Sequence, residues 1–184
     1  MKYGNITRAV FLNRPNRFIA EVDIDGHKET VHVKNTGRCK ELLIPGCEVW
    51  LTAPGTPDRK TKYDLVAVRK GTGILINIDS QASNKVVKEW LETQDYDRVM
   101  SEYTYGDSRI DFVVIDGKKK CFIQVAYYLS GQQTIDREFG AFKPLRDASP
   151  KYVLSMDRLD FSRDGISHIN IVDFLLGKKE LMLT

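Results

Sequence analysis

Residues 17–33, RFIAEVDIDGHKETVHV, contain the clearest strand signal in the chain. Apolar and polar residues alternate from Phe18 to Ile24, which is the two-residue period of a strand with one buried face. Asp25-Gly26 then supplies the dipeptide that favours a type I′ turn, and residues 30–33 return as the partner strand. The stretch therefore predicts an antiparallel hairpin.

The sequence around this hairpin extends it into a small sheet. Further short apolar runs are separated by turn residues at Pro45-Gly46 and in the Pro/Gly-rich stretch 53–57. These runs predict strands over residues 47–52, 63–69 and 74–78. Five or six short strands before residue 78 are typical of a small closed barrel such as an OB-fold.

The pattern changes after residue 78. A helix is expected from Asp79 or Ser80 to Glu92, because its apolar positions recur at helical spacing. Strands are expected at 99–105, 109–115, 120–127 and 152–155, and a second helix at 132–145. The segment 169–176 could be strand or helix. This order predicts an α/β domain with a mixed sheet. We expect a barrel domain over 1–78 and an α/β domain over 79–184.

Length and composition limit the class of protein. The chain has 184 residues, of which 42% are hydrophobic and 29% charged, so it can bury a core. No apolar run approaches the roughly 20 residues of a membrane span, and the polar start lacks a signal peptide. These features predict a soluble cytoplasmic protein with no membrane partner. Three cysteines without a CxxC pair argue against a disulfide framework and a structural zinc site.

Positive charge is concentrated in the first half of the chain. Residues 1–80 hold 13 Lys and Arg against 9 Asp and Glu, whereas residues 81–184 hold 15 against 16. In the polar stretch 32–40, HVKNTGRCK, three cations surround Gly37, which permits close approach of a ligand. Such a loop could bind a phosphate through side chains and amides. A solvated barrel loop explains the same pattern.

A second group of residues surrounds Asp111 in the apolar run SRIDF (108–112). A carboxylate in such a strand needs a partner or a cation. Glu89 on the preceding helix could join it, and two carboxylates are hard oxygen ligands that suit Mg²⁺. The alternative is a structural ion pair of Asp111 with Arg109 or Lys120.

These stretches carry a resemblance to a known family. HVKNTGRCKELL (32–43), KTKYDL (60–65) and SRIDF resemble the sugar fermentation stimulation protein family, SfsA, over about residues 10–115. The resemblance implies an OB-like barrel that binds DNA, followed by a domain similar to the PD-(D/E)xK restriction-endonuclease fold. In the chemistry proposed for that fold two acidic groups hold Mg²⁺, so Mg²⁺ or Mn²⁺ is the candidate cofactor, with none established by the sequence.

The catalytic set of that fold is a helix Glu, a strand Asp and an E-x-K tripeptide on the next strand. Carried over, these positions fall on Glu89, Asp111 and Gln124-Val125-Ala126. The tripeptide has therefore lost both its carboxylate and its lysine. Because loss of one positioned electrostatic group typically costs about 10²- to 10³-fold in rate, the domain is expected to be catalytically impaired.

A second resemblance accounts for this departure. From Phe122 onward, FIQVAYYLS and TIDREFGAF are similar to the C-terminal nuclease-like tail of AAA-type ATP-binding proteins, in which Gln-Val-Ala occupies the same place. Nothing in the sequence matches GxxxxGK[ST], so we predict no ATP binding.

Three hypotheses of function follow. The leading one is a DNA-binding protein whose candidate phosphate contacts are Arg14, Arg17, Lys34, Asn35, Arg38 and Lys40. The second is a nuclease in which Asp111, Glu89 or Glu102, and Gln124 hold Mg²⁺ or Mn²⁺. The third is an interaction module in which the cleft of the nuclease-like domain binds a protein partner. This hypothesis predicts an exposed apolar patch near residues 127–129.

Overall fold

The computed structural model describes residues 1–35, 37–55, 59–71 and 73–184. The chain divides into two compact units, Met1–Gln81 and Ala82–Thr184, which are called here the N-terminal and C-terminal units. Backbone hydrogen bonds hold residues 78–80 in the N-terminal unit: Ile78 N donates to Val66 O at 2.8 Å and Ser80 N to Lys34 O at 2.9 Å. Residues 56 and 57 of the expected turn 53–57 lie outside the described residues.

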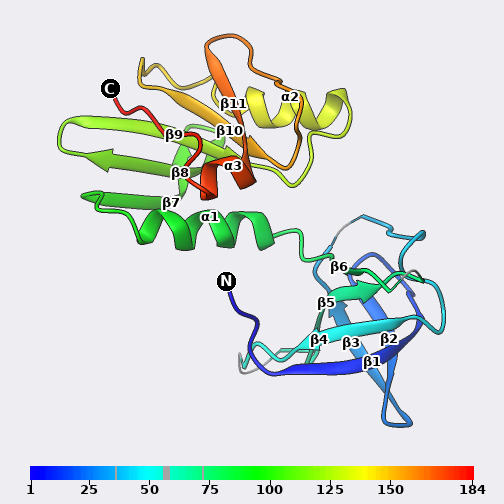
Figure 1. The fold of residues 1–184 in the computed structure, drawn as a ribbon. Helices are drawn as coiled ribbons and strands as arrows, with labels where there is room; N and C mark the ends of the chain where they lie inside the picture. Colours follow the sequence, from blue (N-terminus) through cyan, green and yellow to red (C-terminus); the bar gives the residue numbers. More distant parts are fainter. Residues whose placement is uncertain (36, 56–58, 72) are drawn as a thin grey trace. The chain divides into compact units, whose positions relative to one another are not determined.

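The N-terminal unit is a six-stranded sheet (Figure 1). Its strands are β1 (Ile6–Asn13), β2 (Ile19–Ile24), β3 (His27–Val33), β4 (Glu48–Thr52), β5 (Asp64–Arg69) and β6 (Leu75–Asn77). They lie in the order β3-β2-β1-β4-β5-β6, and β3 also pairs in parallel with β5. The pairings therefore run from β1 through β2, β3, β5 and β4 back to β1. This closed circuit of five strands is the topology expected of an OB-type barrel.

The hairpin at the start of this circuit forms as the sequence predicts. Ile24 pairs with His27, and both turn residues adopt positive φ, 52° at Asp25 and 82° at Gly26. These are the angles of a type I′ turn. The inward-facing residues of the hairpin, among them Val22 and Val31, are fully buried in the barrel core.

The C-terminal unit is a mixed five-stranded sheet between helices (Figure 1). Its elements are α1 (Ala82–Glu92), β7 (Arg98–Tyr105), β8 (Ser108–Asp116), β9 (Lys119–Val125), α2 (Gln132–Gly140), β10 (Lys151–Ser155), β11 (Ile166–Asn170) and α3 (Ile171–Leu175). The order is β11-β10-β9-β8-β7, antiparallel from β7 to β9 and parallel from β9 to β11. Val87 of α1 and Phe174 of α3 pack in one core cluster, whereas Ile135 and Phe139 of α2 pack in another.

Several boundaries differ from the prediction. Strand β1 was not predicted, because only Ala9 and Phe11 of its eight residues are buried. The expected helix 132–145 ends at Gly140. The ambiguous segment 169–176 is strand up to Asn170 and helix from Ile171, because the Asn170 side chain accepts hydrogen bonds from two backbone amides of α3. Within the described ranges no helix is long and apolar enough to cross a membrane.

Candidate nucleic-acid interface and carboxylate site

Arg14, which follows β1 directly, joins two loops of the N-terminal unit. Its Nη1 donates to the carbonyl oxygens of Gly37 and Arg38, both at 2.7 Å, and its Nη2 to those of Arg17 at 2.6 Å and Asn35 at 2.7 Å. Arg14 Nε is buried without a hydrogen-bond partner. The terminal nitrogens of the Arg14 guanidinium therefore bind the protein's own backbone and hold the two loops together.

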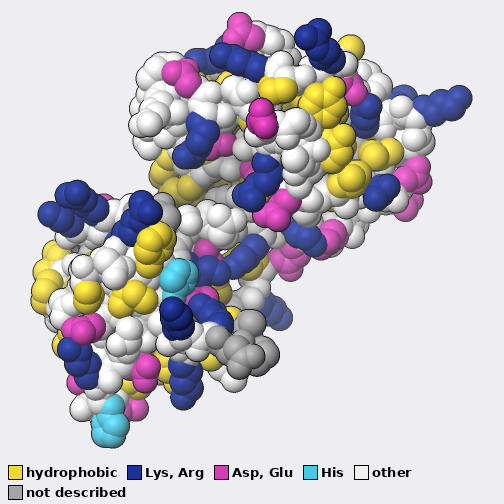
Figure 2. All heavy atoms as spheres, turned by 180° about the vertical axis from the view of Figure 1, so that it is seen from behind, with side chains coloured by type: hydrophobic (Ala, Val, Ile, Leu, Met, Phe, Trp, Pro, Cys, Tyr) yellow, Lys and Arg dark blue, Asp and Glu magenta, His cyan; other side chains and the backbone are white. Residues whose placement is uncertain are grey.

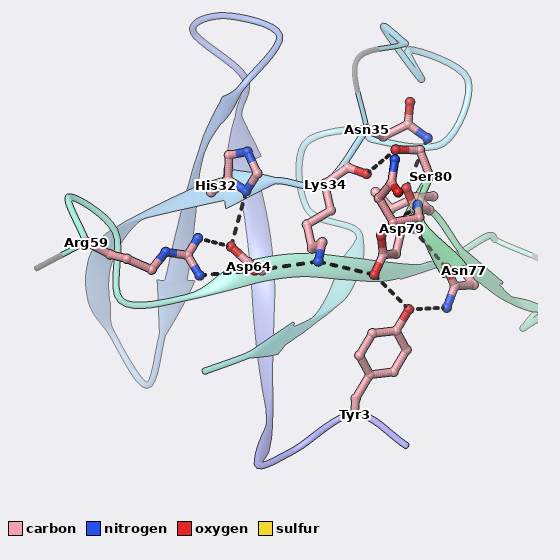
Figure 3. Close-up of polar contacts among 11 residues, drawn as sticks. Tyr3, His32, Lys34, Asn35, Arg59, Asp64, Asn77, Asp79 and Ser80 are labelled. Atoms are coloured by element: carbon pink, nitrogen blue, oxygen red, sulfur yellow. Dashed lines mark hydrogen bonds and ion pairs between the residues drawn. The ribbon is translucent and has the colours of Figure 1, made fainter. Parts of the chain in front are cut away.

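Lys34 and Asn35 also turn toward the protein. Lys34 Nζ lies 3.4 Å from Asp79 Oδ2 and 3.9 Å from Asp64 Oδ2, between the two carboxylates (Figure 3). Asn35 Nδ2 donates to Ile78 O at 3.0 Å. Two carboxylates thus balance the charge of the partly exposed Lys34, and the Asn35 amide binds the backbone.

Asp64 is the centre of this polar network. Arg59 donates to it from both terminal nitrogens, and His32 Nδ1 lies 3.2 Å from its Oδ1 (Figure 3). Burial alone would raise the pKa of Asp64, but the hydrogen bonds and charge of Arg59, with smaller effects of His32 and Lys34, hold this pKa below its usual value. Residues from the HVKN and KTKYDL motifs therefore meet in one ion-paired network at the junction of β3 and β5.

At the other end of the network, Asp79 binds the start of the chain. Tyr3 Oη donates to Asp79 Oδ2 at 3.3 Å and accepts from Asn77 Nδ2 at 2.8 Å (Figure 3). Ser80 Oγ donates to the Lys34 carbonyl at 3.0 Å. These contacts tie the segment after β6 to the end of β3, which is a structural role.

The remaining candidate cations are exposed. Arg17, Arg38 and Lys40 have exposed side chains, and the Arg17 guanidinium lies 4.6 Å from the centre of the Phe18 ring. Figure 2 shows Lys and Arg side chains gathered around a histidine on one face of the N-terminal unit. Since Arg14 binds the carbonyls of both Arg17 and Arg38, these two exposed arginines belong to loops that are held together.

In the C-terminal unit, Asp111 and Gln124 come together from neighbouring strands. Asp111 Oδ2 accepts a hydrogen bond from Val125 N at 2.8 Å, and Asp111 N donates to Gln124 Oε1 at 3.2 Å. Burial raises the pKa of Asp111, and the negative charge of Glu138 raises it further, against the hydrogen bonds from Val125 N and Asn84.

Glu89 does not lie with this pair. Ser83, Val87 and Leu91 form the buried face of α1, and Glu89 is exposed on the opposite side. The α1 side chain that hydrogen-bonds Asp111 is Asn84, which sequence reasoning missed. The prediction that Glu89 joins Asp111 is therefore corrected by the helical phase of α1.

Among the described residues, neither expected partner forms an ion pair with Asp111, although the charge of Arg109 lowers the pKa of Asp111 somewhat. Arg109 pairs with the exposed Glu102 at 3.6 Å, and Lys120 pairs with Asp147 at 2.5 Å. Glu102 is therefore engaged with Arg109 on the surface of β7 and β8.

Glu138 of α2 was also missed. It is 5% exposed, and its Oε1 accepts from Arg137 Nε at 2.9 Å and Nη2 at 2.6 Å. Its spacing from Ile135 and Phe139 places it on the buried face of α2, so helical periodicity would have found it.

The donors around Asp111 fit a divalent cation only in part. Two carboxylates and the Gln124 amide oxygen are hard ligands of the kind that Mg²⁺, Mn²⁺ and Ca²⁺ accept. Among the described residues, no three His, Cys, Asp or Glu side chains are grouped as a metal site. Ala126, at the place of the E-x-K lysine, is buried in the core cluster under α2.

The apolar patch expected near residues 127–129 is reduced to two tyrosines. Tyr127 and Tyr128 are exposed, with ring centres 4.7 Å apart in an edge arrangement. Leu129 is 2% exposed, because it packs with Phe139 and Phe142.

Two family models match the chain. The SfsA N-terminal OB domain matches residues 12–78, and the sugar fermentation stimulation protein RE domain matches residues 81–128. Both end before residue 129, and together they confirm the predicted OB-like fold and the family resemblance.

Curated relatives and a solved structure agree with these matches. A sugar fermentation stimulation protein homolog of Desulfitobacterium hafniense is 55% identical over 128 residues, which are 68% of this chain and 56% of the relative. The homolog of Ruminiclostridium cellulolyticum is 52% identical over 129 residues, 68% of this chain and 57% of the relative. The chain spans about half the length of the curated relatives it matches. The structure of Pyrococcus furiosus SfsA in complex with Ca²⁺ has a TM-score of 0.66 at 24% identity, covering 97% of this chain and 85% of that chain, and so shares its fold.

Proposed function

The chain belongs to the sugar fermentation stimulation protein family, and from this premise we propose that it binds DNA mainly through phosphate contacts of its N-terminal unit. The observation that carries the proposal is the placement of Arg17, Arg38 and Lys40. All three are exposed, and they lie on two loops that Arg14 holds together.

The position of these cations suits an OB-type interface. OB-folds bind nucleic acid over the second and third strands and the adjoining loops, including the loop between strands 1 and 2. Arg17 lies in that loop, between β1 and β2, and Arg38 and Lys40 follow β3. Cations at these places contact phosphates without reading base sequence, so the binding is expected to be largely independent of sequence.

The salt dependence of DNA binding tests the proposal. Three phosphate contacts give a slope of log K against log salt of about −2.7, because each neutralised phosphate contributes about −0.9. The double variant Arg38→Ala/Lys40→Ala should reduce that slope by about 1.8. The matched control is Lys118→Ala/Lys119→Ala, which removes two exposed cations of the C-terminal unit and should leave the slope unchanged.

The measurement is fluorescence anisotropy of labelled DNA titrated with protein between about 50 and 200 mM salt, the range over which such contacts weaken most visibly. No binding at the lowest salt, or equal slopes for the two double variants, would remove the proposal.

A second candidate function is cation-dependent phosphodiester cleavage at Asp111, and the observation that favours it is the buried Glu138. The negative charge of Glu138 raises the pKa of Asp111, so a divalent cation at Asp111 would be attracted by both carboxylates, in competition with the two hydrogen bonds that Arg137 donates to Glu138 Oε1. The solved structure similar to this chain is of a protein in complex with Ca²⁺. Asp111, Glu138 and the Gln124 amide would hold the ion, which when bound polarises phosphate and activates water.

Nicking of supercoiled plasmid with Mn²⁺ tests this candidate. Asp111→Asn and Glu138→Gln each remove one charge from the site, and both should abolish nicking that the wild type performs. Glu89→Gln is the matched control, because Glu89 is exposed on the far side of α1. If the Asp111 variant nicks as fast as the wild type, the cleavage does not come from this site.

A further inference from the structure

Phe18 is an exposed aromatic residue on a loop whose backbone is fixed. It is 44% exposed, although Phe is usually buried in folded proteins. Its N–H donates to Asn16 Oδ1 at 2.9 Å, and its carbonyl accepts from Val33 N at 2.7 Å. The ring is therefore presented to solvent from an ordered position directly before β2.

One cation contacts this ring, and a second basic loop lies beside it. The Arg17 guanidinium lies 4.6 Å from the ring centre, which is within the range of a cation–π contact. The carbonyls of Arg17 and Arg38 bind the same Arg14 guanidinium, at 2.6 and 2.7 Å. Loop 14–18 and the loop that carries Arg38 and Lys40 are thus adjacent, although about twenty residues separate them in sequence. We call the exposed Phe18 ring, together with the exposed Arg17, Arg38 and Lys40 on these two adjacent loops, the Phe18 surface.

We propose that the Phe18 surface binds single-stranded nucleic acid, with one base stacked on Phe18 and neighbouring phosphates on Arg17, Arg38 and Lys40. The bases of a duplex are stacked on each other and closed to an aromatic side chain, whereas those of a single strand are open to it. An apolar ring framed by cations matches a ligand that alternates flat bases with anions. This inference rests on the proposed DNA binding and specifies the form of nucleic acid.

The test compares single-stranded oligothymidine of about 12 nucleotides with a duplex of the same length by anisotropy, at the same series of salt concentrations for both. Phe18→Ala should weaken binding of the single strand by about 5- to 150-fold, the cost of one lost stacked base. Duplex affinity should not change, and neither should the salt slope for the single strand, because no cation is removed.

Two further variants separate stacking from folding. Phe18→Leu keeps an apolar side chain without a flat ring and should bind like Phe18→Ala, whereas Phe18→Trp should restore binding. Tyr105→Ala is the matched control, because it removes an aromatic residue of similar exposure, 40%, from the C-terminal unit.

The outcomes of the two proposals are distinct. If the wild type binds neither form of DNA, the proposed function fails. If it binds both forms, but Phe18→Ala binds the single strand as tightly as Tyr105→Ala does, DNA binding stands and the stacking inference is overturned. The same holds if duplex is bound more tightly than single strand.

Discussion

Substitution of Arg14 by Ala should destabilise the N-terminal unit by about 2–3 kcal/mol. The change removes four hydrogen bonds from a charged donor, each worth about 1.5–3 kcal/mol when buried. Three of the four lie at exposed positions, where water replaces much of what is lost. The change also removes Arg14 Nε, a buried donor without a partner, which offsets part of the loss.

The same position distinguishes a structural role from a phosphate contact. The Arg14→Lys variant keeps the charge, but the lysine ammonium carries its donors on one nitrogen and cannot reach four carbonyls as the planar guanidinium does. We therefore expect Arg14→Lys to lose about half of what Arg14→Ala loses. A residue acting only as a phosphate contact would leave the unfolding free energy unchanged in both variants.

Urea unfolding followed by Trp50 fluorescence measures this effect. The chain has two tryptophans, and a Trp90→Phe background leaves Trp50, on β4, to report on the N-terminal unit. Arg17→Ala is the matched control and should change the free energy of unfolding by no more than about 0.5 kcal/mol, because the Arg17 side chain is exposed. Equal unfolding midpoints for the Arg14→Ala and Arg17→Ala variants would refute the reasoning.

Three further predictions concern burial and charge. The pKa of Asp64 lies below its ordinary value of 3.8, so its ion pairs stabilise the N-terminal unit above pH 4, and this stabilisation is lost as the pH falls through the folded-state pKa. In an acid titration of unfolding, Asp64→Asn should lack this loss of stability. An identical acid transition in the variant and the wild type would contradict the prediction. Burial raises the pKa of the Cys121 thiol to about 12, so a thiol reagent at pH 8 should label Cys121 only after unfolding, as mass spectrometry of native protein would check. Phe174→Ala should cost the C-terminal unit about 3–5 kcal/mol, seen as a lower urea midpoint by Trp90 fluorescence, because Phe174 is fully buried against Trp90; the exposed Leu176→Ala is its control.

Local signals in the sequence predict the elements that local contacts form. The hairpin at Asp25-Gly26 needs only its turn and the alternation beside it, and it folds as expected. Strand β1 contains a continuous apolar run, residues 9–12, which does not alternate, and its pairing with β2 and β4 decides that only Ala9 and Phe11 face the core. The boundary between β11 and α3 was within reach, because Asn170 is a strong N-cap residue.

Charge in a sequence does not say which cations are paired. Lys34 and Lys40 lie six residues apart in one basic stretch, yet Lys34 is held between two carboxylates and Lys40 is exposed. The carboxylates come from Asp64 and Asp79, which reach Lys34 only because β3 pairs with β5 and the chain after β6 returns to the end of β3. Long-range pairing of strands therefore decides which cations of this stretch are ion-paired and which are exposed.

At the carboxylate site, in contrast, the sequence alone contains the information needed: the helical phase favours Glu138 over Glu89 as the glutamate that faces the sheet. Ser83, Val87 and Leu91 place Glu89 away from the sheet, whereas Ile135 and Phe139 place Glu138 toward it. The prediction of Glu89 followed the order of the PD-(D/E)xK motif, in which a helix Glu precedes the strand Asp. In the proposed cation site Glu138, which lies beyond the family match, would supply the carboxylate that position 124 lacks, whereas Ala126, at the place of the lysine, packs in the core. Binding of a cation at Asp111 would therefore not by itself imply cleavage, because Ala126 stands where the lysine that stabilises the charged phosphate is expected.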